Sequence, residues 1–198
     1  FYLGKYEITQ AQYEAVMTGN SDGLSATPSR WPNNQNRPVE QVSWEDAQIF
    51  LTRLNVQQSA NIPAGWAYVL PTESQWEYAC RAGTTTAYSW GSSIAASNAN
   101  YDQSGISQTR DVGQYAANPW GFFDMHGNLW EWTADWYQAY PTGNPVVDPT
   151  SPASGSSRVL RGGSWGSVGS FLRSAMRNYN TPSNRRNNLG FRVGFQQQ

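Results

Sequence analysis

The feature that most constrains this chain is a long stretch, residues 84–158, in which neither helical nor strand periodicity is apparent. It consists mostly of Gly, Ser, Asn, Asp and Pro, with aromatic residues scattered among them. Loops of this length inside a compact domain are uncommon and usually have a functional or metal-related reason. We therefore expect long, packed loops that carry short strands, supported by regular elements before and after them.

Regular structure is predicted on both sides of this stretch. Apolar residues at helical spacing follow three N-terminal capping patterns, so we expect helices there, the first ending at Gly19 and the third at Gly83. The three capping pairs are Thr9 with Gln12, Ser43 with Asp46, and Thr72 with Gln75. Short strands are expected at residues 1–8, 67–70, 157–161 and 190–195. No linker or fixed-period repeat divides the chain, which predicts one domain over residues 1–198.

Composition explains how such a chain can have a core and excludes several classes of protein. Only 14% of the 198 residues are charged, but 14% are aromatic, including ten Trp and eleven Tyr. Large rings bury much apolar area, so the chain is expected to fold rather than stay disordered. No apolar run is long enough to span a membrane. The chain opens at Phe1 with no signal-like leader, so we expect any targeting segment to be absent or removed.

The chain has one cysteine, Cys80, and one histidine, His126. A disulfide within the chain, a cysteine metal cluster and a multi-histidine metal site are therefore excluded. His126 is left as the sole imidazole that could serve as a base. No serine or cysteine nucleophile motif accompanies it, so we expect a structural role.

Charge is distributed unevenly along the chain. All fourteen Asp and Glu lie within residues 1–148, whereas residues 149–198 contain seven Arg and no acid. This asymmetry fits either a surface that binds nucleic acid or another anion, or Arg side chains that pair internally with the acidic part. Arg without Lys favours internal pairing, because planar guanidinium groups suit partly buried contacts. We therefore expect no nucleic-acid partner.

A series of ordered motifs covers essentially the whole chain. They are residues 4–9 (GKYEIT), 38–47 (PVEQVSWEDA), 70–79 (LPTESQWEYA), 124–132 (DMHGNLWEW), 160–165 (LRGGSW) and 189–193 (LGFRV). In this order they closely resemble the formylglycine-generating enzyme (sulfatase-modifying factor) family. The resemblance implies an α+β fold of the C-type lectin-like kind, with few helices, a twisted antiparallel sheet and much irregular structure.

The resemblance does not extend to the family's chemistry. Catalytic members bind copper through a cysteine pair just after the Arg-Gly-Gly-Ser-aromatic motif, and the corresponding residues 166–172 contain no cysteine. Serine cannot replace the soft thiolate ligands of a cuprous ion. Related iron-dependent members use several histidines. We therefore expect no enzymatic activity of this kind and no catalytic residues, and a structural role for Cys80.

Calcium is the one cofactor that the resemblance suggests. Asn128 and Glu131, with the backbone carbonyl of Leu129, match a family calcium site built from loop oxygens, the donors a hard cation prefers. The alternative is that Asn128 and Glu131 simply hydrogen-bond the backbone of a tight turn. Asn100 and the Tyr101 carbonyl match a second site, but Gly113 stands where its carboxylate is expected.

Residues 166–188 also resemble the C-terminal variable region of diversity-generating retroelement target proteins, which are of bacterial or phage origin. In those systems template adenines are mutated, most often in Asn codons. Adenine changes in an Asn codon yield Ser, Gly, Val, Phe, Tyr, Thr or Arg, but never Trp, Met, Lys, Glu or Gln. Met176 fails this test and is included with that exception. The predicted ligand-binding positions are Gly166, Ser167, Val168, Ser170, Phe171, Met176, Asn178, Tyr179, Asn180, Thr181, Ser183, Asn184, Arg186, Asn187 and Asn188.

This pattern predicts a non-catalytic protein that binds a protein or other surface ligand through side chains exposed on a stable scaffold. Ser, Gly and Asn with an occasional aromatic residue are also typical of antibody paratopes. Phe171 and Tyr179 are the expected anchors, with Val168 beside them. Two alternatives stay open: a divergent formylglycine-generating-type oxidase, and a lectin-like interaction module that is not diversified. The sequence leaves the ligand, the oligomeric state and the compartment open.

Overall fold

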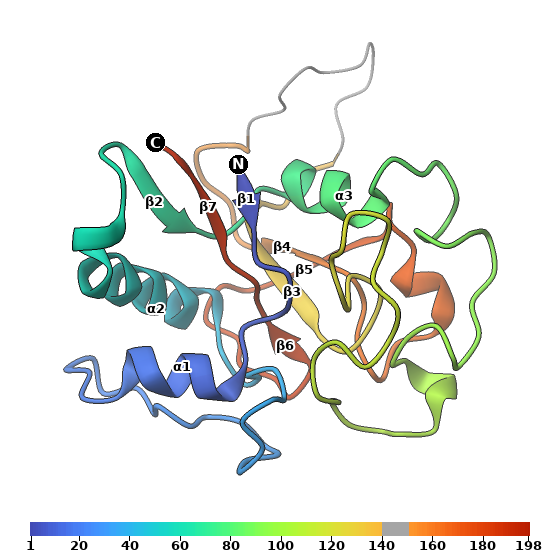
Figure 1. Cartoon of the computed structure of the whole chain (residues 1–198), viewed down its shortest axis with the longest axis horizontal. Helices are drawn as coiled ribbons and strands as arrows, with labels where there is room; N and C mark the ends of the chain where they lie inside the picture. The colour runs from blue at the N-terminus through green and yellow to red at the C-terminus, as the bar shows by residue number, and fades with distance from the viewer. Residues whose placement is uncertain (140–150) are drawn as a thin grey trace.

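The computed structural model describes residues 1–139 and 151–198. Three α-helices, seven strands and three short 3-10 turns are assigned in these residues (Figure 1). In chain order they are β1 (Tyr2–Leu3), α1 (Gln10–Met17), α2 (Trp44–Gln57), η1 (Ser59–Asn61), β2 (Trp66–Val69), α3 (Glu73–Arg81), η2 (Asp102–Ser104), β3 (Trp130–Trp136), β4 (Arg158–Arg161), η3 (Gly169–Leu172), β5 (Arg177–Asn180), β6 (Leu189–Gly190) and β7 (Gly194–Gln197).

All three helices begin where the sequence predicts. Thr9, Ser43 and Thr72 are the N-caps of α1, α2 and α3, and each forms a complete capping box with the residue three positions on. Such a box satisfies two backbone donors that the helix itself leaves open. The capping patterns therefore determine the residue at which each of the three helices begins.

Two strand predictions need correction. The strand expected over residues 1–8 is only Tyr2–Leu3, although Gly4 N and Ile8 N still donate to the carbonyls of Val193 and Phe191. The strand expected over residues 190–195 is divided between β6 and β7. The division lies at Arg192, whose side chain is fully buried beside Glu131. The break between the two strands thus coincides with a buried ion pair.

The strands form two small sheets. Strands β1, β7 and β2 make an antiparallel sheet in that order. The second sheet has the order β5-β4-β3-β6, with β6 parallel to β3 and the other pairs antiparallel. Figure 1 shows β1 and β7 side by side, so the two ends of the printed chain lie close together. This arrangement is the α+β, C-type lectin-like architecture that the sequence predicts.

The irregular stretch is present as expected in the residues described. Between α3 and β3, residues 82–129 contain the turn η2 and an isolated bridge between Tyr88 and Gly91. The seven-residue strand β3 interrupts the predicted stretch 84–158 and is the longest strand described. Part of that prediction, residues 140–150, lies outside the described residues. Most of the protein's loops gather on the right of Figure 1, away from α1 and α2.

Apolar side chains form one large core and two smaller ones. The large core joins α1, α2 and both sheets, with Phe50, Trp132 and Phe191 among its buried members. A second cluster lies under α3 around Trp76. A third joins Leu172 to Tyr88 and Tyr101, directly beneath the turn η3. The two smaller cores therefore support the loop-rich side of the molecule.

Arginines of the C-terminal part pair with acids of the N-terminal part, as the charge pattern predicts. Arg161 bridges to Glu77, Arg177 to Glu73, and Arg185 to both oxygens of Asp46. Arg192 and Glu131, both fully buried, form the same kind of pair. Arg158 lies instead between the rings of Trp44 and Trp136, at 3.7 and 3.5 Å. No helix within the described ranges is long and apolar enough to cross a membrane.

Candidate functional site

Residues 166–188 link β4 to β6 as the turn η3, the edge strand β5 and two irregular turns. The trace, orange to red-orange in Figure 1, spans the loop side of the molecule and the edge of the four-stranded sheet. More than half of the predicted ligand-binding positions are exposed there. These are Gly166, Val168, Ser170, Phe171, Tyr179, Thr181, Ser183 and Arg186.

The two expected anchors, Phe171 and Tyr179, and the neighbouring Val168 are exposed, and both aromatic rings contact other rings. Val168, Phe171 and Tyr179 are 49%, 41% and 52% exposed. Phe171 lies tilted against Trp130, and the ring of Tyr179 is 4.2 Å from that of Tyr137. Partial stacking of this kind lowers the entropy that an aromatic side chain loses on binding.

Ser167 differs from the other predicted positions. Its side chain is buried, and its hydroxyl accepts a hydrogen bond from the backbone N–H of Ser164 at 3.0 Å. The codon test cannot detect this, because serine is an allowed product whichever way the side chain points. Ser167 is therefore a structural residue of the turn and is not displayed.

The remaining predicted positions are partly buried. Met176 packs against the large apolar core, which agrees with its failure in the codon test. The side chain of Asn180 accepts hydrogen bonds from the backbone of Thr181 and from Asn184, so these residues shape the turn after β5. The other half-buried positions are Asn178, Asn187 and Asn188.

The scaffold holds this segment mainly through its backbone carbonyls. The backbone N–H of Gln41 donates to the carbonyl of Arg186, and that of Trp44 to the carbonyl of Pro182. In the same way, Asp102 donates to Ser167 and Trp130 to Asn188. Strand β5 pairs with β4 through all four of its residues. None of these contacts requires a particular side chain at the accepting position. The backbone is thus fixed while the exposed side chains remain free to differ.

Buried side chains of the scaffold make further contacts of the same type. Arg161 donates to the carbonyls of Ser174 and Met176, and Tyr88 OH donates to the carbonyl of Gly169 at 2.8 Å. Leu172 is the apolar counterpart, with its side chain fully buried below η3. Framework residues thus alternate with exposed ones inside the segment.

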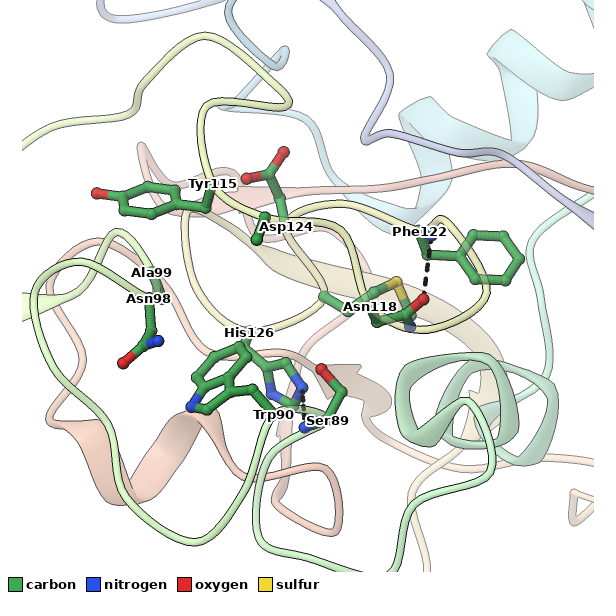
Figure 2. A pocket seen from close by; sticks show the side chains of 11 residues that line it. Ser89, Trp90, Asn98, Ala99, Tyr115, Asn118, Phe122, Asp124 and His126 are labelled. Carbon is green, nitrogen blue, oxygen red and sulfur yellow. Dashed lines mark hydrogen bonds between the residues drawn. The ribbon is translucent and has the colours of Figure 1, made fainter.

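His126 lies outside the segment and holds its backbone in the same way. Its Nδ1 donates to the Leu172 carbonyl at 2.6 Å, and its Nε2 accepts from the backbone N–H of Ser89 (Figure 2). Burial lowers the pKa of His126 to about 4, with a further lowering from Arg81, against the opposing effect of the Leu172 carbonyl. A neutral imidazole with both nitrogens engaged is a structural bridge and has no free nitrogen for base catalysis.

Cys80 lies beside this histidine, with its sulfur 3.5 Å from Nε2. The thiol is fully buried, and burial raises the pKa of Cys80 to about 12. A reactive cysteine needs an accessible thiolate, so this pair lacks the properties of a catalytic dyad. A small cavity of about 10 Å³, roughly the space of one water, lies next to His126. Figure 2 shows the side chains that line it.

The residues predicted to hold calcium do not fit that role. Both oxygens of Glu131 accept hydrogen bonds from Arg192, and one also accepts from Trp76 Nε1. Oε2 therefore accepts two hydrogen bonds and Oε1 one, and the charge of the carboxylate is already balanced by the buried guanidinium of Arg192. Within the part of the chain that the structure describes, no three His, Cys, Asp or Glu side chains are grouped so as to hold a metal.

Asn128 instead joins two distant segments of the chain. This is close to the predicted alternative to calcium binding, in which Asn128 forms hydrogen bonds to the backbone. Its side-chain oxygen accepts from the backbone N–H of Arg110, and its nitrogen donates to Glu7 at 2.7 Å. Leu129 contributes its backbone N–H to the same carboxylate. Burial, then the charges of Asp124 and Glu131, hold the pKa of Glu7 well above its usual range. This motif therefore connects the loop at Arg110 to the N-terminal segment at Glu7 through hydrogen bonds.

The proposed second calcium site is used in the same way. Asn100 donates from its side chain to Gln108 O and to Asn128, and its oxygen accepts from Ser104. At Gly113, where the carboxylate was missing, the backbone N–H donates to Asp124. The loop oxygens that the resemblance assigned to calcium therefore hold the loops to each other.

Comparison with known proteins identifies the family. The model of the sulfatase-modifying factor enzyme 1-like domain matches residues 1–196. The chain belongs to this family. A formylglycine-generating enzyme of Streptomyces coelicolor is 36% identical over 176 residues, which cover 79% of this chain and 52% of that protein. The chain thus spans about half the length of that curated relative.

Solved structures extend the likeness to nearly the whole chain. Treponema denticola variable protein 1 superimposes with a TM-score of 0.82 at 29% identity, covering 99% of this chain and 84% of that one. PvdO from Pseudomonas aeruginosa gives a TM-score of 0.83 at 26% identity, covering 99% and 80%. The proteins of similar structure therefore include one that is named a variable protein.

Sequence reasoning missed two exposed aromatic residues that lie outside the segment and border it. Tyr137, 36% exposed, follows β3 and stacks on Tyr179. Trp90, 38% exposed, stacks on Tyr88, whose hydroxyl reaches Gly169. Both lie in the aperiodic stretch, where no repeating pattern distinguishes an exposed ring from a buried one.

Proposed function

We propose that this protein is a non-catalytic ligand-binding variable protein, diversified by a retroelement, that binds a protein surface through the exposed residues of segment 166–188. The observation that carries the proposal is the separation of roles within that segment. The backbone and the buried residues Leu172 and Ser174 are held by the scaffold, whereas positions that pass the codon test are mostly exposed. A diversified surface needs this independence from its own side chains.

The displayed chemistry supports a protein ligand. Three large exposed side chains lie among small Ser, Gly, Thr and Asn residues, which is the composition of a paratope. Aromatic anchors surrounded by adaptable polar groups are typical of binding hot spots. The likeness to Treponema denticola variable protein 1 over nearly the whole chain supports the same reading.

An oxidase function is the second candidate, because sequence relatives are formylglycine-generating enzymes. The chain has one cysteine, which is buried and far from a thiolate state. Two thiolates at residues 166–172 would be needed for copper of the family kind, and that turn carries none. Copper titration with a cysteine-containing peptide substrate tests this candidate. Tight copper binding with oxidation of the peptide would replace the proposed function.

Two matched libraries test the variable-protein function. The first recodes the exposed positions Val168, Ser170, Phe171, Tyr179 and Thr181 with adenine-mutated Asn codons, and the second does the same at Ser164, Ser167, Leu172, Ser174 and Leu189. Protease resistance of the displayed protein measures folding, and sorting on lysozyme, an arbitrary purified protein, measures binding. We expect most members of the first library to fold and some to bind, and most of the second to unfold.

Equal loss of folding in the two libraries would contradict the proposal, because the exposed side chains would then be part of the core. A second, independent measurement is the gene sequence in sibling isolates. Differences should concentrate in the codons of the exposed positions, next to a reverse-transcriptase gene and a near-identical template repeat. Differences spread evenly along the gene would favour a lectin-like module that is not diversified.

A further inference from the structure

A second candidate binding surface lies outside the variable segment. Arg37, Ile106, Gln108, Arg110, Asp111 and Gln114 line an open, polar groove of about 470 Å³. The groove lies where the loop before α2 meets the loop that follows η2, and the backbone N–H of Val112 donates to the Asn36 carbonyl across this junction. A groove of this size accommodates a few residues of an extended peptide.

The two arginines of the groove differ from those of the C-terminal part. Arg161, Arg177, Arg185 and Arg192 each pair with a carboxylate, whereas in residues 1–139 and 151–198 no carboxylate lies within 4.0 Å of either groove arginine. Among the residues described, the Arg37 side chain donates only to Gln108, at 3.4 Å, and its Nε has no hydrogen-bond partner. Its charge acts on the buried Glu40 without a direct contact.

Arg110 likewise has no ion pair within 4.0 Å among the described residues, although its charge acts on Asp124. Its guanidinium lies 5.3 Å from the ring centre of Tyr115 and donates to that hydroxyl at 3.3 Å. The one acid of the groove, Asp111, accepts a hydrogen bond from Asn34 at 2.8 Å. The groove therefore holds two guanidinium groups with unused donors and one carboxylate, one oxygen of which accepts a hydrogen bond from Asn34.

The groove is built on rigid supports. The backbone N–H and carbonyl of Arg110 both bond the side chain of Asn128, and the Gln108 carbonyl accepts from Asn100. These are the loop residues that the family resemblance assigned to calcium. A groove held in this way presents its arginines without the ordering cost that a mobile loop would add.

The groove also adjoins the variable segment on both of its sides. Gln41, four residues after Arg37, donates to the carbonyl of Arg186, and Asp102, four residues before Ile106, donates to that of Ser167. Four residues span at most about 14 Å. A protein seated on the exposed side chains of residues 166–188 is therefore wide enough to cover the groove as well.

We propose that this groove binds an acidic segment of the protein ligand, with Arg37 and Arg110 as the receptors for its carboxylates. This inference rests on the proposed function for its partner, but the groove itself does not include the displayed positions of residues 166–188. Guanidinium groups bind carboxylates through paired, charge-assisted hydrogen bonds. The amides of Gln108 and Gln114 complement the backbone of an extended chain. The groove thus supplies a constant contact beside a variable one.

Fluorescence anisotropy with a labelled pentaglutamate peptide tests the groove on the protein as it is. We expect saturable binding at low salt that weakens at high salt, because the contact is electrostatic. Arg37→Gln and Arg110→Gln should each weaken binding about tenfold, the usual effect of losing one charge-assisted hydrogen-bonded contact. A pentaglutamine peptide should not bind. Circular dichroism verifies that both variants fold. If one of them does not fold, the other is sufficient to test the groove.

Arg30→Gln is the matched control, since Arg30 is an exposed arginine of the same loop that does not line the groove. It should change binding less than about twofold. An equal loss in Arg30→Gln, or no saturable binding, would overturn the inference. A Phe171→Ser, Tyr179→Ser double variant separates the two proposals, because it should leave pentaglutamate binding unchanged. If that double variant abolishes binding of a selected protein ligand while both groove variants bind it normally, the groove inference fails and the proposed function stands.

Discussion

Two sides of the molecule are stabilised by different kinds of interaction. One side is built on α1 and α2, and the other is the loop side. Around α1 and α2, apolar side chains such as Tyr13, Phe50 and Phe191 fill one continuous core. On the loop side, two smaller apolar clusters are supplemented by buried polar residues that hold backbone carbonyls. The stability of the helical side therefore depends mainly on apolar side-chain packing. The loop side depends in addition on hydrogen bonds to its backbone.

This difference explains how one fold can tolerate variation at one place. A side chain in a packed core cannot change size without a cost in stability. A backbone carbonyl held by Arg161 or His126 remains an acceptor whatever side chain its residue carries. Variation is thus tolerated where the scaffold recognises main-chain atoms and the side chain is exposed.

The largest expected effect comes from the buried ion pair behind the loop side. Arg192→Ala leaves the Glu131 carboxylate without its guanidinium and removes donors to the carbonyls of Gly4 and Phe123. Breaking a fully buried pair by removing one partner costs about 3–5 kcal/mol in free energy of unfolding. Urea denaturation measures this value.

Arg186→Ala is the matched control, because Arg186 is exposed and should change stability by less than about 0.5 kcal/mol. If the two arginine variants lost equal stability, buried polar contacts would not be what holds the loop side, and the comparison between the two sides would fail.

A second prediction compares neighbours within one turn. Leu172 is fully buried and Phe171 is 41% exposed, although both belong to η3. Leu172→Ala should lower the free energy of unfolding by about 2–5 kcal/mol, because it opens a cavity in the small core below the turn. Phe171→Ala should lower it by less than about 1 kcal/mol while weakening ligand binding. A larger loss for Phe171 would assign that ring to the core.

The regular elements could be predicted from the sequence because their signals are local. Capping pairs such as Ser43 with Asp46 fix a helix start within four residues. The family motifs predicted the fold. Of the fifteen positions that the adenine-codon pattern and its framing selected, eight are exposed. The unequal placement of arginines predicted their internal pairing, as Arg177 with Glu73 illustrates.

The orientation of individual side chains could not be predicted in this way. Ser167 and Ser170 are equivalent in the codon test, but one is buried and the other exposed. Glu131 has the right residue type for a metal ligand, and only its position beside Arg192, sixty-one residues away, shows that its oxygens are used. Such outcomes depend on long-range contacts that a local pattern does not contain.

A third prediction uses a buried acid that lies outside the loop side. Glu40 is fully buried, with one oxygen bonded to Trp31 N and the other without a partner. Burial raises the pKa of Glu40 to about 7, against the opposing hydrogen bonds from the backbone of Trp31 and Arg30. The folded state therefore keeps this proton to a higher pH than the unfolded chain does, so this group's contribution to stability falls as pH rises from about 4.5 to about 7.

Glu40→Gln removes that titration. The variant should be more stable than the parent protein by about 1–2 kcal/mol at pH 8, with little difference at pH 4. Thermal denaturation as a function of pH measures the slope. An unchanged pH profile would indicate that Glu40 remains charged and has a partner in solution.

The smallest effect on stability is expected at Tyr179, where the comparison is tested most directly. Tyr179 is 52% exposed, and its main stacking partner is the half-exposed Tyr137. Its backbone is paired with Val159 of β4, so Tyr179→Ser keeps the strand and removes only the displayed ring. The free energy of unfolding should change by about 0.5 kcal/mol or less, since an exposed ring contact contributes little. Affinity for a ligand selected on the parent surface should fall at least about tenfold, as expected for an aromatic hot spot. Tyr137→Ser, the same change at the other ring of the stack, is the matched variant: if it lowers affinity as much as Tyr179→Ser, the ligand-binding surface extends beyond residues 166–188.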